Sequence, residues 1–280
     1  LVLSSAPGVA SPAEGLRAGG DITVTASDVT GIKAGNVAAS VAISIAGGGA
    51  SVAIAASPAT NTIDDRVRAN VDASSLTSTG GSVDLSATSD NRVEALSVAA
   101  ALAISAGLYT GAAAGAGATA TNKIGGNAAT PQLTEASITG GSAVAADTGL
   151  SVQASDTSDI TANVLGIAVA GGAGGVGVGV STTLNEIGGL VTAYVADSTA
   201  RTTTGDLAIG ADATQTIDVL SVAVAAGTSG AGAGAEATAK ITNTVSAYAR
   251  SVALTAGGQV RVAADSDQTA TADTAGAGAG

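Results

Sequence analysis

Large apolar residues alternate with small ones along much of the chain. In 37–56, VAASVAISIAGGGASVAIAA, Val and Ile take one set of alternate positions and Ala and Ser take the other. LSVAAALAI (96–104) and VGVGV (176–180) repeat the arrangement. A period of two places alternate residues on opposite faces of a strand, and Val, Ile and Thr with interspersed Gly favour strands over helices. The pattern predicts an all-β protein.

A strand motif recurs along the sequence, in which Gly precedes alternating apolar residues, Ala and an acidic residue. Its copies are GDITVTASD (20–28), GSVDLSATSD (81–90), GLSVQASD (149–156), GDLAIGAD (205–212) and GQVRVAADSD (258–267). The copies predict modules of about 60 residues at 20–80, 81–147, 148–204 and 205–257, with a partial module at 258–280 and 1–19 as the tail of a preceding one. We expect the chain to be a fragment of a longer one.

A repeat so poor in bulky residues cannot form a core alone and should stack on its neighbours. We therefore predict a repetitive parallel β-solenoid, or β-helix, with Ala/Gly-rich strands, as one continuous repeat domain over 1–280. At about 20 residues per coil, a module would contain about three coils, and the chain would form a rod about 65 Å long. The insertion NAATPQLTEAS (127–137) is expected to be a corner loop.

The two faces of the apolar stretches differ in side-chain size. We expect the large residues Val37, Val41, Ile43 and Ile45 to point into the solenoid. The opposite face is free of charge, and such patches usually mark interfaces. We predict that it is buried, against a second row of strands or against another copy, the alternative being that Ala and Gly merely fill an exposed face. The candidate interface residues are Ala38, Ser40, Ala42, Ser44, Ala99, Ala101, Ala103, Ala168, Gly177, Gly179, Ala223 and Ala225.

Composition excludes several classes of function. The 280 residues carry a net charge of −12 and include no Cys, His or Met, and three Tyr are the only aromatic residues. Without His and Cys the chain lacks the usual zinc and copper ligands and cannot form a Ser-His-Asp triad. The acidic charge disfavours nucleic acid and anionic membranes as partners. We therefore expect a protein that is not an enzyme and fits the outside of a bacterial cell.

Each copy of the strand motif is expected to end in an acidic turn, because Asp after a strand bonds its own backbone. The turn residues are Asp28, Asp90, Asp156, Asp212, Asp265 and Asp267. Aligned carboxylates suit Ca²⁺, but equivalent residues three coils apart would be separated by about 14 Å. No cofactor is predicted, and Ca²⁺ at these turns is the alternative.

Strands of about ten residues joined by glycines are also typical of transmembrane hairpins. Spanning strands usually carry aromatic girdles and a polar opposite face. Here Tyr109 is the only aromatic residue in the apolar stretches 37–56, 96–121, 164–184 and 219–235, and the opposite face is Ala and Gly. We predict that the chain does not span a membrane.

NEIGGLVTAYVADS (185–198) and KITNTVSAYARS (240–251) follow the Gly/Ala-rich stretches of their modules. Together with the Gly-led strand and the acidic residue, they resemble repeats of large bacterial filamentous surface adhesins, the leukotoxin-like and filamentous-haemagglutinin-like families. The resemblance implies a secreted β-solenoid at the cell surface with an adhesive or structural role.

Two functions remain open at this point. The first is an extracellular structural protein that self-associates into a fibre or surface filament through the Ala/Gly/Ser faces. The second is the shaft of a surface adhesin, which binds host or neighbouring-cell molecules through a loop or through segments outside the 280 residues. A charge on the small face, as in Ala101→Glu or Ala168→Glu, is expected to abolish assembly under the first and to be nearly silent under the second.

Overall fold

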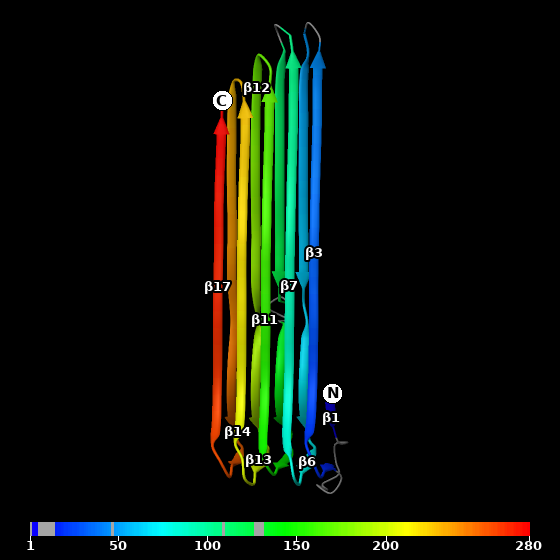
Figure 1. The fold of residues 1–280 in the computed structure, drawn as a ribbon, viewed down its shortest axis with the longest axis vertical. Coiled ribbons are helices and arrows are strands. Elements are labelled where there is room, and N and C mark those ends of the chain that lie inside the picture. Colours follow the sequence, from blue (N-terminus) through cyan, green and yellow to red (C-terminus); the bar gives the residue numbers. More distant parts are fainter. Residues whose placement is uncertain (1, 5–14, 46–47, 108–109, 126–131) are drawn as a thin grey trace.

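A computed structural model of the chain describes residues 2–4, 15–45, 48–107, 110–125 and 132–280. The described residues form β-strands and no helix. All strand pairs are parallel, and they form three sheets (Figure 1). The predicted all-β parallel solenoid is confirmed.

The three sheets differ in strand length, and we name them the front, back and base sheets. The front sheet contains β3 (Ile22–Ile45), β7 (Ser82–Ala106), β11 (Gly149–Gly171), β14 (Leu207–Gly227) and β17 (Val260–Ala279). The back sheet contains β1 (Val2–Ser4), β4 (Ala50–Ile63), β5 (Arg66–Asp72), β8 (Gly111–Ile124), β9 (Leu133–Thr139), β12 (Gly174–Ala196) and β15 (Gly230–Arg250). The base sheet contains β2 (Leu16–Ala18), β6 (Ser75–Ser78), β10 (Ala143–Ala146), β13 (Thr199–Thr202) and β16 (Ala253–Thr255).

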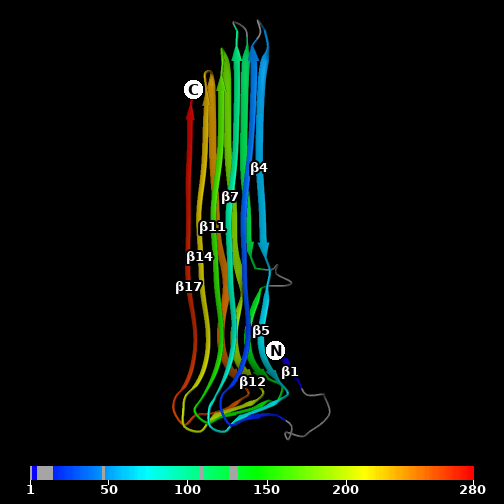
Figure 2. The same ribbon diagram turned by 45° about the vertical axis from the view of Figure 1, so that its right-hand side comes forward.

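Each coil ascends one front strand, descends the back sheet and returns through a short base strand (Figures 1 and 2). The Ala of each strand motif pairs directly with the Ala of the next, in the series Ala26, Ala87, Ala154, Ala211 and Ala264. One copy of the motif therefore corresponds to one coil, and the prediction of three coils per module is wrong.

The front strands are 20 to 25 residues long. At about 3.3 Å per residue, the longest extends about 80 Å, whereas five strands spaced about 4.8 Å apart stack over only about 20 Å. The long axis of the molecule therefore lies along the strands (Figure 1), and the predicted rod along the stacking axis is wrong. The alternation of inward and outward side chains continues through the Asp residues of the motif. These residues therefore lie inside strands and not in the turns we expected.

The cross-section changes along the strands. At the lower end in Figure 2 the front sheet bends and the base sheet closes a third side. Buried Leu76, Leu85, Ile138 and Ile209 belong to the hydrophobic core of this part, which we call the base. Above it, a band of buried isoleucines that includes Ile124, Ile160 and Ile187 lies between the front and back sheets.

The upper part of the molecule consists of the front and back sheets alone, and we call it the arm. Its front-sheet residues are 37–45, 98–106, 165–171, 222–227 and 275–279, and its back-sheet residues are 50–57, 111–118, 174–181 and 230–235. Its core is almost entirely Ala. Within the described part of the chain, nothing resembles a helix of the length and hydropathy needed to cross a bilayer.

Candidate functional site

The charge-free face predicted as an interface lies inside the arm, between the front and back sheets. Ala99, Ala101, Ala103, Ala168, Ala223 and Ala225 are at most 3% exposed. Gly177 and Gly179 are buried on the back sheet, and Ala38, Ser40, Ala42 and Ser44 are half-buried on the edge strand β3. The small face therefore packs within the chain. The version of the prediction that placed the buried residues between copies is wrong.

Glycine is needed inside the arm because the two backbones come very close. A Cβ added at Gly177 would lie 2.4 Å from the carbonyl oxygen of Ala226, and one at Gly179 would lie 2.5 Å from that of Val224. Real Cβ atoms do not approach oxygen atoms so closely. The gap between the sheets therefore admits only hydrogen, methyl and hydroxymethyl side chains over most of the arm.

The large residues of the alternation point out of the arm. Val37, Val41, Ile43 and Ile45 are between 62% and 82% exposed, so the prediction that they point into the solenoid is wrong. Alternation sorts residues onto two faces, but it does not say which face is inside. The narrow gap between the sheets selects the small set, and the large set is left outside.

These outward residues form two apolar surfaces on opposite sides of the arm. The front face contains Val37, Val41, Ile43, Ile45, Val98, Leu102, Ile104, Leu165, Ile167, Val169, Val222 and Val224. The back face contains Val52, Ile54, Val176, Val178 and Val180, which are 44% to 72% exposed. No charged residue occurs on either sheet within the arm as defined.

Below the arm the same outer side of the front sheet is charged. Acidic residues outnumber basic ones there, with Asp84, Asp90, Glu94, Asp159, Asp212, Asp218, Asp265, Asp267 and Asp273 against Lys33, Arg92 and Arg261. Lys33 and Arg92 pair with Glu94 at 2.8 and 2.9 Å. Because these pairs are exposed, solvent screens them and they contribute little to stability. The Lys33 ammonium, with a smaller contribution from Arg92, holds the pKa of Glu94 below its ordinary value.

Polar ladders cross the interior from coil to coil. The side-chain amide of Asn61 donates to Asn122, and that of Asn122 donates to Asn185, each at 2.7 Å. All three residues are buried. Such ladders satisfy buried amides within the stack and favour one register between coils.

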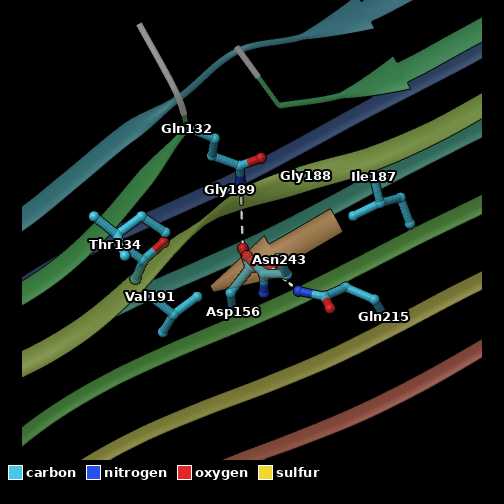
Figure 3. Close-up of a pocket in the computed structure, with 10 residues that line it drawn as sticks. Gln132, Thr134, Asp156, Ile187, Gly188, Gly189, Val191, Gln215 and Asn243 are labelled. Atoms are coloured by element: carbon cyan, nitrogen blue, oxygen red, sulfur yellow. Dashed lines mark hydrogen bonds between the residues drawn. The ribbon is translucent and has the colours of Figure 1, made fainter. Parts of the chain in front are cut away.

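A buried polar layer separates the base core from the isoleucine band (Figure 3). Asp156 on β11 accepts hydrogen bonds from Gln132 Nε2 and Gln215 Nε2 at 3.2 Å each and from Ser158 Oγ at 3.0 Å. Burial raises the pKa of the Asp156 carboxyl, and the hydrogen bonds from Gln215 and Ser158 offset part of that rise. Buried oxygen atoms of Gln215 and Asn243 in the same layer have no hydrogen-bond partner.

The motif Asp residues do not converge on one site. The anchoring Ala points inward, so an Asp two residues later also takes an inward position, as Asp28 and Asp156 do. An Asp one or three residues after that Ala points outward, as Asp90, Asp212, Asp265 and Asp267 do. Neighbouring coils lie about 4.8 Å apart, so the estimated 14 Å separation is wrong. Within 15–45, 48–107, 110–125 and 132–280, no group of three or more acidic side chains is arranged to hold a metal ion.

The polar layer contains residues that the sequence interpretation did not single out. Gln132 lies in the insertion 127–137, where Leu133–Ser137 belong to β9, so the corner-loop prediction is wrong for that part. Residues 127–131 lie outside the described residues. Counting positions from the anchoring Ala of each motif would have identified Asp28 and Asp156 as the two inward-facing carboxyls. No comparable signal distinguishes Gln132.

No family model, curated protein or solved structure matches the chain. The function is therefore argued from the geometry of its surfaces.

Proposed function

We propose that the chain is an extracellular structural protein that self-associates into a fibre or surface filament through the outer faces of its arm. One observation carries the proposal: the arm exposes large aliphatic side chains on two opposite, charge-free faces. They are contiguous on the front face, and on the back face Ala113, Gly115 and Gly117 of β8 separate those of β4 from those of β12. Soluble monomers rarely expose contiguous apolar patches of more than a few hundred Å², and larger ones mark interaction surfaces. In this proposal the Ala/Gly/Ser faces pack the front sheet against the back sheet within each chain, and the contacts between copies form through the outer faces.

Two opposite faces favour an open assembly over a closed dimer. A copy bound to the front face leaves the back face uncovered, and the reverse is equally true. Each added copy therefore presents a new apolar face, so association continues unless its symmetry closes a ring. An extended slab with two such faces is suited to building a long polymer.

The interior offers little scope for catalysis. Asp156 is only 5% exposed, and the ladder residue Asn122 is fully buried. Placement outside a bacterial cell belongs to the proposal, and the acidic, Cys-free composition is compatible with it. The sequence resemblance to filamentous adhesin repeats points in the same direction.

The test is electron microscopy and sedimentation of the purified chain over a concentration series. The double variant Ile104→Asp, Val178→Asp places one charge on each outer face. The control Thr157→Asp, Thr121→Asp changes exposed outward residues on the same two sheets below the arm. We expect the unaltered chain and the control to form filaments and the double variant to remain monomeric. Isolated slabs of the unaltered chain at every concentration would contradict the proposal and favour the adhesin shaft.

A further inference from the structure

We propose that the front face of the arm binds the front face of a second copy, with the strands of the two copies antiparallel and only the arms overlapping. The inference rests on the proposed function and specifies the partner and geometry of one of its two contacts.

The front face has the dimensions of a stable interface. The arm residues of the front sheet decrease from nine on β3 and β7 to seven on β11, six on β14 and five on β17. At about 3.3 Å per residue and about 4.8 Å between strands, they cover about 570 Å². Two such faces would bury about 1,100 Å² in total, just above the roughly 1,000 Å² expected of a specific interface.

Aliphatic residues form rows across this face, because equivalent positions pair in register. Val37, Val98, Leu165 and Val222 form one row, and Val41, Leu102 and Val169 form another. Rows of branched side chains on flat sheets can interdigitate across a dry interface. A second front face offers the same rows and is therefore complementary to the first.

Charge selects the orientation of the second copy. If the strands of the two copies were parallel, their acidic lower halves would face each other at about the 10 Å spacing of packed sheets. Facing like charges disfavour such an arrangement. A twofold axis in the interface plane, perpendicular to the strands and near Ile167, makes the arms overlap. It also places the acidic halves at opposite ends of the pair.

The sheet edges favour a protein partner over lipid. Within the described residues, β3 and β17 each have a strand neighbour on one side only in the front sheet. Their outer backbone groups can be hydrated in water, but each unpaired group costs several kcal/mol in hydrocarbon. A second copy covers the apolar face and leaves these edges in water.

Because the chain contains no Cys, a thiol-reactive label attaches only at the Cys that a single-Cys variant introduces, and the distance between labels then measures the geometry of the pair. Ile167 and Thr157 point outward on β11 and are ten residues apart, which is about 33 Å along the strand. In the antiparallel pair, spin labels on Ile167→Cys should lie within about 20 Å of each other, because the twofold axis passes near this residue and packed sheets are about 10 Å apart. Spin labels on Thr157→Cys should lie about 65 Å apart across this contact. In a parallel pair, both positions would face their counterparts at about 10 Å.

Charge variants test whether the front face is used at all. Ile167→Asp should weaken the front-face contact roughly tenfold or more, because a buried charge meets its own copy across the twofold axis. Thr157→Asp, on the same strand and face, should leave it unchanged. Ile167→Thr retains a β-branched side chain and should have an intermediate effect, which separates weakened association from misfolding.

The outcomes separate the inference from the proposed function. Short label separations at both positions, or unchanged assembly of Ile167→Asp, would overturn the antiparallel front-face contact while leaving self-association intact. A monomer at all concentrations would overturn both. Binding of the unaltered chain to phosphatidylcholine vesicles in place of self-association would also overturn both and identify lipid as the occupant.

Discussion

The base and the arm are built from the same strands with opposite arrangements of side-chain size. In β7, the inward residues Val83 and Leu85 fill the base, and the inward residues Ala99, Ala101 and Ala103 fill the arm. The odd-numbered residues of β7 face inward along the whole strand. In the base these positions carry large residues, and in the arm they carry Ala. The interior is therefore wide in the base and narrow in the arm.

The difference implies two sources of stability. The base buries large aliphatic side chains, each contributing about 1.5–3 kcal/mol. The arm buries little more than methyl groups, so its order relies on parallel backbone pairing and close sheet contact. Its large side chains remain uncovered in a single copy. The arm is therefore the part of the molecule that gains most from association.

The largest expected effect comes from a charge inside the arm. Ala168 is fully buried, so Ala168→Glu places a carboxylate in a gap without room or partner and should cost about 4 kcal/mol. The variant earlier considered as a test of assembly thus becomes a test of folding. Denaturant unfolding measures the loss. Val169→Glu, one residue away and outward, should cost about 1 kcal/mol or less, and equal losses would contradict the assignment of the two faces.

Removal of a large side chain should distinguish the base from the arm surface. Leu85 is buried in the base, and Leu85→Ala should cost about 3 kcal/mol. Leu102→Ala removes the same atoms from the outer front face and should cost about 1 kcal/mol or less in the monomer. Thermal unfolding at low protein concentration compares them. A larger loss for Leu102→Ala would show that the arm is packed through its large face.

The addition of a single methyl group inside the arm should lower the free energy of unfolding. Gly179→Ala places Cβ against the Val224 carbonyl and should cost about 1–3 kcal/mol. Gly115 on β8 has no atom near the equivalent position, so Gly115→Ala should be neutral or stabilising by up to about 1 kcal/mol. Hydrogen exchange of arm amides detects the difference, and identical protection in the two variants would contradict the close sheet contact.

The smallest effect concerns the buried carboxyl between base and arm. Burial raises the pKa of Asp156, so the folded chain binds the proton more tightly than the unfolded chain. The unfolding free energy therefore falls as pH rises through the folded-state pKa. Asp156→Asn should stabilise the protein at pH 7 by roughly 1 kcal/mol or less, and its advantage should shrink as pH falls through that pKa. Destabilisation at pH 7 would mean that the hydrogen bonds of the carboxylate outweigh its burial.

Much of the architecture could be predicted from local pattern. The period of two predicted strands, and the recurring Gly-led motif predicted a repeat. The copies of the motif pair directly, with Ala87 beside Ala26 and Ala154, whereas three coils per module had been expected. Which set of side chains faces the interior of the arm could not be predicted in the same way. The alternation places Val41 and Ala42 on opposite faces of the strand, but it does not say which face is inside. Hydrophobicity favoured the larger side chain inside, but the distance between the sheets is a tertiary property and reversed that choice. The number of coils was wrong because a coil of about 20 residues was assumed, and because Asp was interpreted as a turn residue that ends each strand.

The candidate surfaces were harder to predict than the fold. Ala168 lies on the front sheet and Gly177 on the back sheet, and the two point toward each other, so the contact that covers them comes from within the chain. The polar layer depends on Gln132, which joins Asp156 only after the back sheet has folded against the front sheet. Interactions that bridge two sheets leave no periodic signal along one strand.

The measurement that tests the account most directly is thiol labelling of two neighbouring positions near the end of β7. Ile104 is 40% exposed on the front face, and Ser105, 5% exposed, faces the back sheet. We expect the thiol of Ile104→Cys to react rapidly in the dilute monomer and slowly after association, and that of Ser105→Cys to react slowly in both. Rapid reaction at position 105 with protection at position 104 in the monomer would show that the large face is inside and would contradict the account.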